Sequence, residues 1–138
     1  MKTCKLLREQ VAAATGSKKA ELVLKNAQIV NVFTQSVETG DIAIEGGYIV
    51  GIGNYEGITE KDLGGAYVCP GFLDGHIHIE SSMTSPGEFE RAVVPHGTTA
   101  VITDPHEIAN VAGTAGIRFM MQSAQKLDLD VYFMLPSC

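Results

Sequence analysis

The chain has 138 residues, of which 45% are hydrophobic and 19% are charged, a composition typical of a folded protein with a hydrophobic core. Ten Lys and Arg residues stand against 16 Asp and Glu residues, which gives a formal net charge of −6 at pH 7. Because binding to phosphate backbones needs clustered Lys and Arg side chains, and these are scattered here, we expect no nucleic-acid partner.

Cysteine spacing and hydropathy exclude further classes of protein. Cys4, Cys69 and Cys138 lie far apart in the sequence and form no C-x-x-C pair, which excludes zinc-ribbon and thioredoxin-type sites. Isolated thiols suit a reducing compartment, and no stretch approaches the ~20 apolar residues that span a bilayer. We therefore expect a cytoplasmic protein without a membrane partner.

The first half of the chain is predicted to hold a small β-domain behind a helical segment. Residues 1–20 form the helical segment, because their apolar side chains recur on one helical face. Residues 21–68 show short β-rich runs, and we expect them to form a small β-sandwich-like domain. Gly46 and Gly47 predict a two-residue hairpin turn, and the polar residues 54–65 predict a loop.

The second half of the chain alternates apolar strands with helices. Residues 69–138 contain strands that begin near residues 72, 99 and 130. Such alternation predicts an α/β fold with a parallel sheet. The repeat of roughly 30 residues fits the first strands and helices of a (β/α)8 TIM-type barrel, which needs about 250 residues. We therefore expect a truncated barrel, in an N-terminal piece of a longer protein.

Local signals predict two helices in this half. Ser85 as N-cap and Glu88 three residues later form a capping-box pattern, which predicts a helix that runs to about Val94. Residues 104–113 are expected to form a loop. A second helix is predicted by apolar residues at helical spacing, the two methionines among them being expected in the core: Ile117, Met120, Met121 and Ala124.

Two histidines one residue apart end the first apolar strand of this half. Side chains in a strand alternate between its faces, so His76 and His78 project from one face and Ile77 from the other. Converging imidazoles suit a transition metal, although a catalytic metal usually has at least three protein ligands. The pair therefore predicts part of a metal site, and the alternative is two ordinary polar residues.

Acidic and polar residues follow the first two barrel strands, where barrel active sites lie. Asp104, His106 and Glu107 follow the second strand, and Glu80 and Ser81 directly follow the histidine pair. We expect these five residues to contact the substrate or to hydrogen-bond to a metal ligand. The alternatives are a turn-capping aspartate, a solvated Glu107 and a polar loop cover.

Three stretches of sequence carry a family resemblance. A small β-domain followed by P-G-F-L-D-G-H-I-H at residues 70–78 resembles the amidohydrolase superfamily of metal-dependent barrel hydrolases. The stretches H-I-H-I-E-S-S-M at 76–83 and D-P-H-E-I-A-N-V at 104–111 resemble the bacterial adenine deaminases. The similarity covers nearly the whole chain and corresponds to the first part of such an enzyme.

The resemblance implies a reaction, a cofactor and a set of roles. It implies hydrolytic deamination of adenine to hypoxanthine and ammonia by a metal-activated water, with manganese or iron at a two-ion site. His76 and His78 would be metal ligands. The remaining ligands and the general base would lie beyond residue 138, so the isolated chain is expected to be inactive. Adenine is the expected small-molecule partner. Assembly into a homo-oligomer is a further possibility.

Two other functions stay open beside adenine deamination. One is a hydrolase of cyclic amides within the same superfamily, and the acidic residues at 104–107 favour the deaminase over it. The other is a non-catalytic fragment, which the missing ligands favour for the isolated chain.

Overall fold

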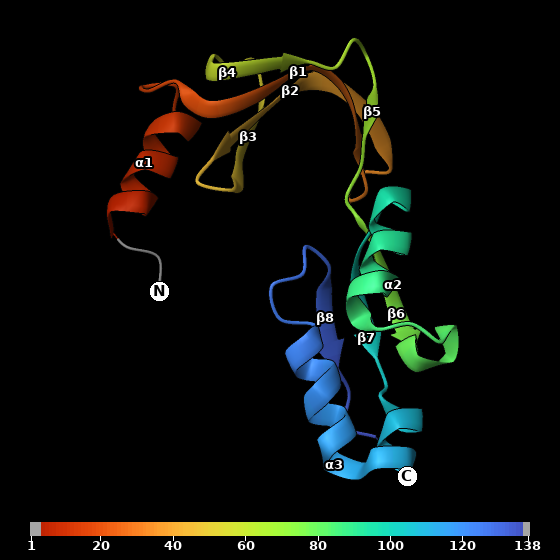
Figure 1. The fold of residues 1–138 in the computed structure, drawn as a ribbon. Helices are drawn as coiled ribbons and strands as arrows, with labels where there is room; N and C mark the ends of the chain where they lie inside the picture. The colour runs from red at the N-terminus through yellow and green to blue at the C-terminus, as the bar shows by residue number, and fades with distance from the viewer. Residues whose placement is uncertain (1–3, 137–138) are drawn as a thin grey trace. The chain divides into compact units, whose positions relative to one another are not determined.

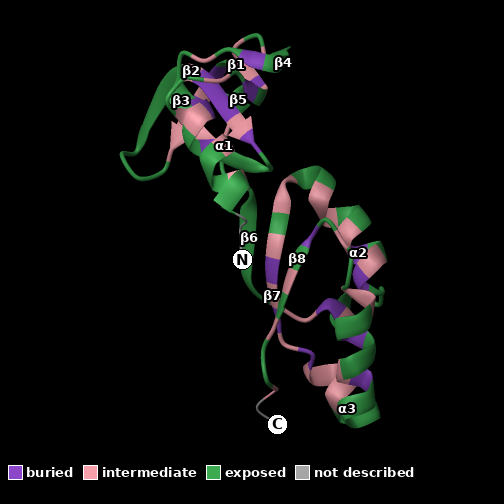
Figure 2. Cartoon of the chain, turned by 90° about the vertical axis from the view of Figure 1, so that its left-hand side faces the viewer, coloured by how far each residue is buried: buried purple, intermediate pink, exposed green. Residues whose placement is uncertain are grey.

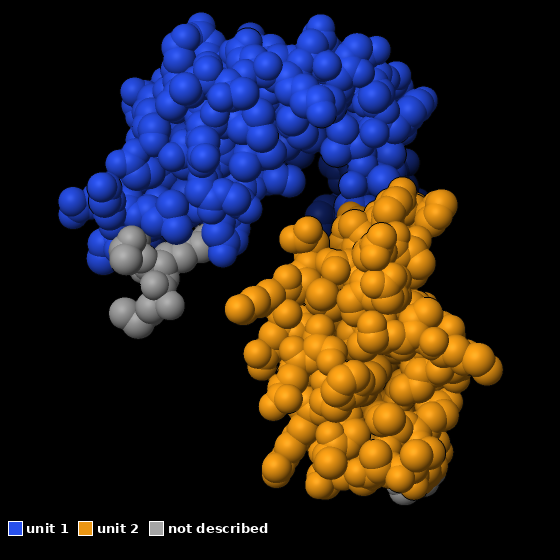
Figure 3. Space-filling view, in the orientation of Figure 1, with its two compact units in different colours: residues 1–70 blue, residues 71–138 orange. Residues whose placement is uncertain are grey.

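The computed structural model describes residues 4–136, and the chain forms two compact units, Met1–Pro70 and Gly71–Cys138 (Figure 3). Each unit has its own sheet and its own clusters of buried hydrophobic side chains. Cys4 and Cys69 are exposed free thiols, whereas Cys138 lies outside the described residues.

Unit 1 consists of a helix followed by five strands (Figure 1). Its elements are α1 (Cys4–Ala14), β1 (Ala20–Asn31), β2 (Ser36–Glu45), β3 (Tyr48–Gly53), β4 (Gly57–Asp62) and β5 (Tyr67–Val68). The helix predicted within residues 1–20 is confirmed. It is followed by Gly16, which takes a left-handed φ of 72° that few other residues adopt.

The strands of unit 1 belong to a single sheet, in which β3, β2, β1 and β4 are neighbours and β5 also pairs with β1. The long strand β1 pairs antiparallel with β2 along one edge and parallel with β4 and then β5 along the other. Because all five strands belong to this one hydrogen-bonded sheet, residues 4–70 form no second sheet facing the first. The expected sandwich-like arrangement is therefore wrong for this part of the chain.

Two local predictions in unit 1 have different outcomes. The hairpin between β2 and β3 turns at Gly46 and Gly47, with φ of 58° and 76°, as the glycine pair predicts. The loop expected at residues 54–65 instead contains β4, so that prediction is wrong. Five of the six residues of β4 are exposed, and its polar sequence therefore lacks the alternation that marks a half-buried strand.

A buried carboxylate organises a bulge in the middle of β1. The register with β2 shifts between Leu24 and Ala27, and Asn26 there takes a φ of 57°. Asp41 accepts hydrogen bonds from the Lys25 ammonium and from the backbone N–H groups of Asn26 and Tyr55. The bond from Lys25 is the main cause that lowers the pKa of Asp41, and burial opposes it.

Unit 2 alternates strands and helices, as the sequence predicts (Figure 1). Its elements are β6 (Phe72–Ile77), η1 (Ile79–Ser82), α2 (Pro86–Val93), η2 (Val94–His96), β7 (Thr98–Thr103), α3 (His106–Ser123) and β8 (Asp130–Phe133). The three strands are parallel, with β7 between β6 and β8. This confirms a mixed α/β fold with a parallel sheet in the second half.

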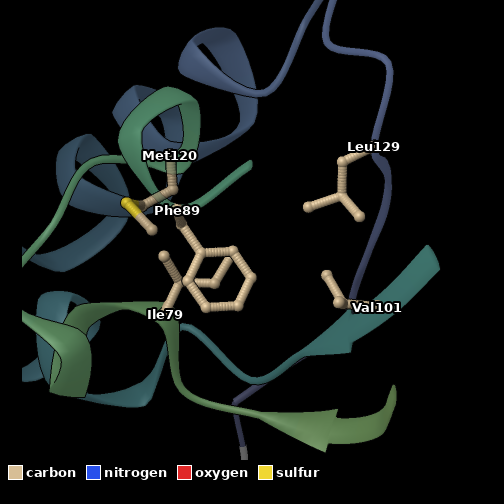
Figure 4. Close-up of a cluster of buried hydrophobic side chains, with 5 residues drawn as sticks. All are labelled: Ile79, Phe89, Val101, Met120 and Leu129. Atoms are coloured by element: carbon tan, nitrogen blue, oxygen red, sulfur yellow. The ribbon is translucent and has the colours of Figure 1, made fainter. Parts of the chain in front are cut away.

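One hydrophobic cluster holds unit 2 together (Figure 4). It joins η1, α2, β7, α3 and the residue before β8 through the following buried side chains: Ile79, Phe89, Val101, Met120 and Leu129. Both helices therefore pack against the same face of the sheet, the one that Val101 occupies. By contrast, β6 is exposed over most of its length (Figure 2).

Three local predictions in unit 2 need correction. Ser85 precedes α2, but its side chain makes no capping hydrogen bond, and Pro86 at the first position opens the helix. The loop expected at 104–113 is helical from His106 onward, so that prediction is wrong. Gly113, which resembles a helix boundary in the sequence, is a kink inside α3. Met120 is buried, whereas Met121 is half exposed and not a core residue.

Within residues 4–136, none of the helices combines the length and the apolar character needed to cross a membrane.

Candidate metal centre

Neighbouring parallel strands bring the predicted site residues to one edge of the unit 2 sheet. Ile77 at the end of β6 pairs with Thr103 at the end of β7. His76 and His78 flank Ile77, and Asp104 directly follows Thr103. The backbone N–H of Asp104 also donates to the carbonyl oxygen of Ile77 at 2.9 Å. The two strand ends are therefore joined at the site.

The two histidine rings converge through one nitrogen each. The Nε2 atoms of His76 and His78 are 3.2 Å apart, and the ring centroids are 5.1 Å apart in an edge-on arrangement. The prediction that both rings project to the same side is thus met by their geometry. The backbone N–H of His76 donates to the Asp74 carboxylate at 3.1 Å, within the last residues of β6, where the register with β7 shifts.

Asp104 completes a group of three candidate ligands. One ligand atom each from His76, His78 and Asp104 lies within 4.8 Å of the other two. The Oδ1 atom of Asp104 is buried and has no hydrogen-bond partner. Buried acceptors without partners are costly, and a bound cation is one way to satisfy them. The orphaned oxygen therefore fits a metal at this point.

The separation of the two imidazole nitrogens also fits a shared ion. Two nitrogen ligands about 2.1 Å from one ion, at about 90–110° to each other, lie roughly 3.0–3.4 Å apart. The observed 3.2 Å between the Nε2 atoms falls within that interval. Two imidazoles and one carboxylate form a mixed nitrogen and oxygen donor set, which suits divalent iron, manganese or zinc.

Glu107 contacts Nδ1 of His78, the ring nitrogen that does not face His76. Its Oε2 lies 2.9 Å from Nδ1 of His78, and its Oε1 accepts a hydrogen bond from the Ser81 hydroxyl at 2.9 Å. The pKa of Glu107 is lowered by its own backbone N–H first, and then by hydrogen bonds from His78 and Ser81. Because an ionised carboxylate only accepts, Nδ1 of His78 carries the proton and Nε2 presents its lone pair.

Glu80 and His106 lie near these residues but outside the group of three ligand atoms. Oε1 of Glu80 accepts a hydrogen bond from the backbone N–H of Ile108 at 3.3 Å, so this carboxylate meets the first turn of α3. The His106 ring stands edge-on to His78, with centroids 6.1 Å apart. All seven residues singled out from the sequence thus lie around the ends of β6 and β7.

Sequence reasoning missed two features of this site. Thr103 is fully buried at the end of β7, and its Oγ1 has no hydrogen-bond partner. Its hydroxyl is hidden in a run of β-branched residues that indicates only a strand. Asp104 was expected to contact the substrate or a metal ligand, whereas its carboxylate lies beside the two imidazoles as a candidate ligand itself. Its position directly after β7, the neighbour of β6, was the signal that could have indicated this.

Comparison with known proteins gives relatives over nearly the whole chain. It is 58% identical to adenine deaminase 2 of Carboxydothermus hydrogenoformans over 134 residues, which are 97% of this chain and 24% of that protein. It is 60% identical to the adenine deaminase of Geobacillus kaustophilus over 132 residues, 96% of this chain and 23% of that protein. The chain thus spans about a quarter of the length of the curated relatives it matches.

A solved structure and a family model agree on the fold. The N-acyl-D-glutamate deacylase of Bordetella bronchiseptica, solved with zinc and a phosphonate inhibitor, matches with a TM-score of 0.61 and 17% identity. The match covers 86% of this chain and 30% of that chain and shows a shared fold. The model of the amidohydrolase family matches residues 67–138, just over half of the sequence. The chain therefore belongs to the amidohydrolase family.

Proposed function

We propose that the chain carries the histidine-pair part of an adenine deaminase, an enzyme that hydrolyses adenine to hypoxanthine and ammonia. One observation carries this proposal: identities of 58% and 60% to adenine deaminases extend over 97% and 96% of the chain. The candidate ligands His76, His78 and Asp104 lie inside that matched length.

In this proposal three side chains would hold a divalent metal, manganese or iron, with two ions in the whole site. A divalent metal lowers the pKa of a water molecule bound to it from 15.7 toward about 7 and so supplies a nucleophile at neutral pH. His76 and His78 offer Nε2 lone pairs, and Asp104 offers its unpartnered oxygen. Adenine is the proposed small-molecule substrate, and self-association is compatible with the proposal.

The residues around the ligands have positioning roles in this proposal. Glu107 keeps the proton of His78 on Nδ1, which leaves Nε2 free to bind. Glu80 accepts from the backbone N–H of Ile108 and so holds the first turn of α3 beside the histidines. The His106 ring stands edge-on to His78, with centroids 6.1 Å apart, and in this proposal it contacts the substrate. Departure of the amine as ammonia requires a proton from a general acid.

A second candidate function is metal binding without turnover. It is favoured by the number of candidate ligands, because the described residues bring three such groups together. Catalytic sites in which two ions act together need more ligands than these three. We therefore expect the 138-residue chain alone to bind a divalent metal and to release no ammonia from adenine.

A chimera tests the proposed activity. This chain replaces the corresponding first quarter of the Geobacillus kaustophilus enzyme, to which it is 60% identical. Ammonia release from adenine is measured with manganese, beside ring opening of a dihydropyrimidine. We expect deamination of adenine, its loss in His76→Ala, and its retention in His96→Ala, since His96 is exposed in η2 and outside the candidate site.

Two results would contradict the proposal. Ring opening without deamination would assign the chain to a hydrolase of cyclic amides. Full deamination by the His76→Ala chimera would remove the histidine pair from the mechanism.

A further inference from the structure

A closed ring of hydrogen bonds links Ser81, Glu107 and His78. The backbone N–H of Ser81 donates to the carbonyl oxygen of His78 at 3.1 Å, within the turn of η1. The hydroxyl of Ser81 donates to Oε1 of Glu107 at 2.9 Å. Oε2 of Glu107 then meets Nδ1 of His78 at 2.9 Å. Ser81 is therefore hydrogen-bonded to the backbone of His78, and Glu107 contacts the imidazole of the same residue.

This ring gives the two oxygens of Glu107 separate partners. The side chain of Glu107 is 45% exposed, and that of His78 is 31% exposed, so packing alone holds neither of them tightly. A carboxylate held at both oxygens loses the freedom to rotate away from the imidazole. The Ser81 hydroxyl supplies the second of these holds. Without the Ser81 hydroxyl, His78 is the one side-chain partner of Glu107 that remains, and water competes with His78 for the carboxylate.

The position of the imidazole proton depends on this hold. As long as Glu107 accepts from Nδ1, the Nε2 atom of His78 presents a lone pair 3.2 Å from Nε2 of His76. If Glu107 swings out to solvent, nothing in the ring favours the proton on Nδ1, and the Nε2–H form becomes accessible. A ligand nitrogen that carries a proton cannot bind a metal.

We propose that Ser81 is a positioning residue that, through Glu107, sets the tautomer of His78 and thereby the strength of divalent-metal binding. The inference rests on the proposed function only for its metal, because the tautomer is a property of the metal-free chain. In this inference the Ser81 hydroxyl donates its proton to Glu107. Ser81 therefore does not use that proton to hydrogen-bond to a substrate.

Imidazole nitrogen resonances test this directly. Long-range proton–nitrogen spectra of the 15N-labelled, metal-free chain report which nitrogen of His78 carries the proton. The variants are Ser81→Ala, Ser81→Thr and a matched control, Ser82→Ala. Ser82 lies in the same turn, but its hydroxyl donates to the carbonyl oxygen of Ile79 and does not reach Glu107. Circular dichroism confirms that each variant keeps its helices and sheets.

We expect Ser81→Ala to move the proton of His78 from Nδ1 toward Nε2, and Ser81→Thr and Ser82→Ala to leave it on Nδ1. Titration with manganese chloride is expected to show binding roughly tenfold weaker in Ser81→Ala and unchanged in the other two, as for loss of an outer hydrogen bond. Retention of the wild-type tautomer in Ser81→Ala overturns the inference, and so does an equal change in Ser82→Ala.

The failure of the proposed function would look different. A chain that binds no manganese but changes its tautomer in Ser81→Ala still supports the role of Ser81, while it removes the metal from the proposed function.

Discussion

Asp104 combines a buried, unpartnered oxygen with a place beside two imidazoles. An acceptor of this kind costs folding free energy in the metal-free chain, of about 1–3 kcal/mol in other proteins. Its Oδ1 atom has no partner among the described residues, although the backbone N–H of the same residue is bonded to Ile77. An unpartnered acceptor beside two imidazoles is the arrangement expected of a proposed metal ligand that lowers the stability of the metal-free chain.

We predict that Asp104→Asn binds manganese more weakly and melts at a higher temperature without metal. The substitution removes the negative charge that attracts the ion and that is costly to bury without a partner. Calorimetric titration measures the first effect and thermal circular dichroism the second. Asp128→Asn is the control, since Asp128 is exposed in the loop before β8. A lower melting temperature with unchanged metal affinity would make Asp104 a structural residue.

The histidine pair was predictable from the sequence because strand alternation alone puts both rings on one side. The ring of hydrogen bonds behind His78 was not, because Ser81 and Glu107 are 26 residues apart. Their contact depends on the pairing of β6 with β7 and on where α3 begins. The sequence shows which residues follow each strand, but the distances between their atoms come from tertiary packing.

At the scale of elements, α3 changes direction at one glycine. Gly113 takes φ 59° and ψ −147°, a combination that is essentially restricted to glycine. It separates the first turns of the helix, which carry His106 and Glu107, from the later turns, which carry the buried Met120. The backbone at this point therefore sets the direction of the later turns relative to the first turns, which carry Glu107.

We predict that Gly113→Ala destabilises unit 2 by about 1–3 kcal/mol, because a side chain strains this backbone conformation. A Cβ at this position meets no atom within 4 Å, so strain and not a clash is the cause. Gly87→Ala is the matched control in α2, where an ordinary φ allows alanine to stabilise the helix by up to about 1 kcal/mol. Urea unfolding compares them, and equal effects would contradict the strain argument.

The Asp41 bulge gives unit 1 a dependence on acid. The pKa of Asp41 lies below its ordinary value of 3.8, first because of the hydrogen bond from Lys25. Its contribution to stability is therefore present above pH 3.8 and is lost as the pH falls through the lowered pKa. The pKa of Lys25 is raised above 10.5, so its contribution is lost only in strong alkali.

We predict that Asp41→Asn flattens the acid side of the stability profile of unit 1. The wild-type free energy of unfolding falls below about pH 4, and the variant, already less stable at neutral pH, loses less of it on acidification. Urea titrations at several pH values between about 2.5 and 7 measure the difference. A variant with the wild-type slope in acid would show that this carboxylate is not paired in solution.

The elements that the sequence predicted well are those with strong periodic patterns. The strands β6, β7 and β8 and the helix α2 were found in order, because apolar runs and turn residues mark them. The strand β4 was missed, since Gly57–Asp62 is polar and lies at an edge of its sheet. The start of α3 was missed because the glycine within it resembles a helix boundary.

At the scale of the whole molecule, each of the two units has its own core. Val23 is fully buried in the sheet of unit 1, and Ile79 is fully buried between the strands and helices of unit 2. Ile79 also directly follows His78, so the core of unit 2 reaches the candidate site. Separate cores lead us to expect that substitutions in one unit leave the other unit folded.

We predict that Ile79→Ala destabilises unit 2 by about 2–5 kcal/mol and that Val23→Ala destabilises unit 1 by about 1–3 kcal/mol. Native-state amide exchange should rise in β7 for the first variant and in β1 for the second. Metal binding should weaken only in Ile79→Ala, because that residue supports the turn after His78. Faster exchange throughout the chain in either variant would show that the two cores unfold together.

The one-sided packing of α2 and α3 has a practical consequence for anyone who handles the chain. Parallel sheets usually have both faces covered, yet Phe72, Leu73 and Tyr132 are between 56% and 60% exposed in this sheet. Exposed apolar surface of this kind binds hydrophobic fluorescent dyes and adsorbs to plastic and chromatography resin. A bright anilinonaphthalene sulfonate signal from a fully folded sample is what the exposed apolar side chains of β6 and β8 would produce.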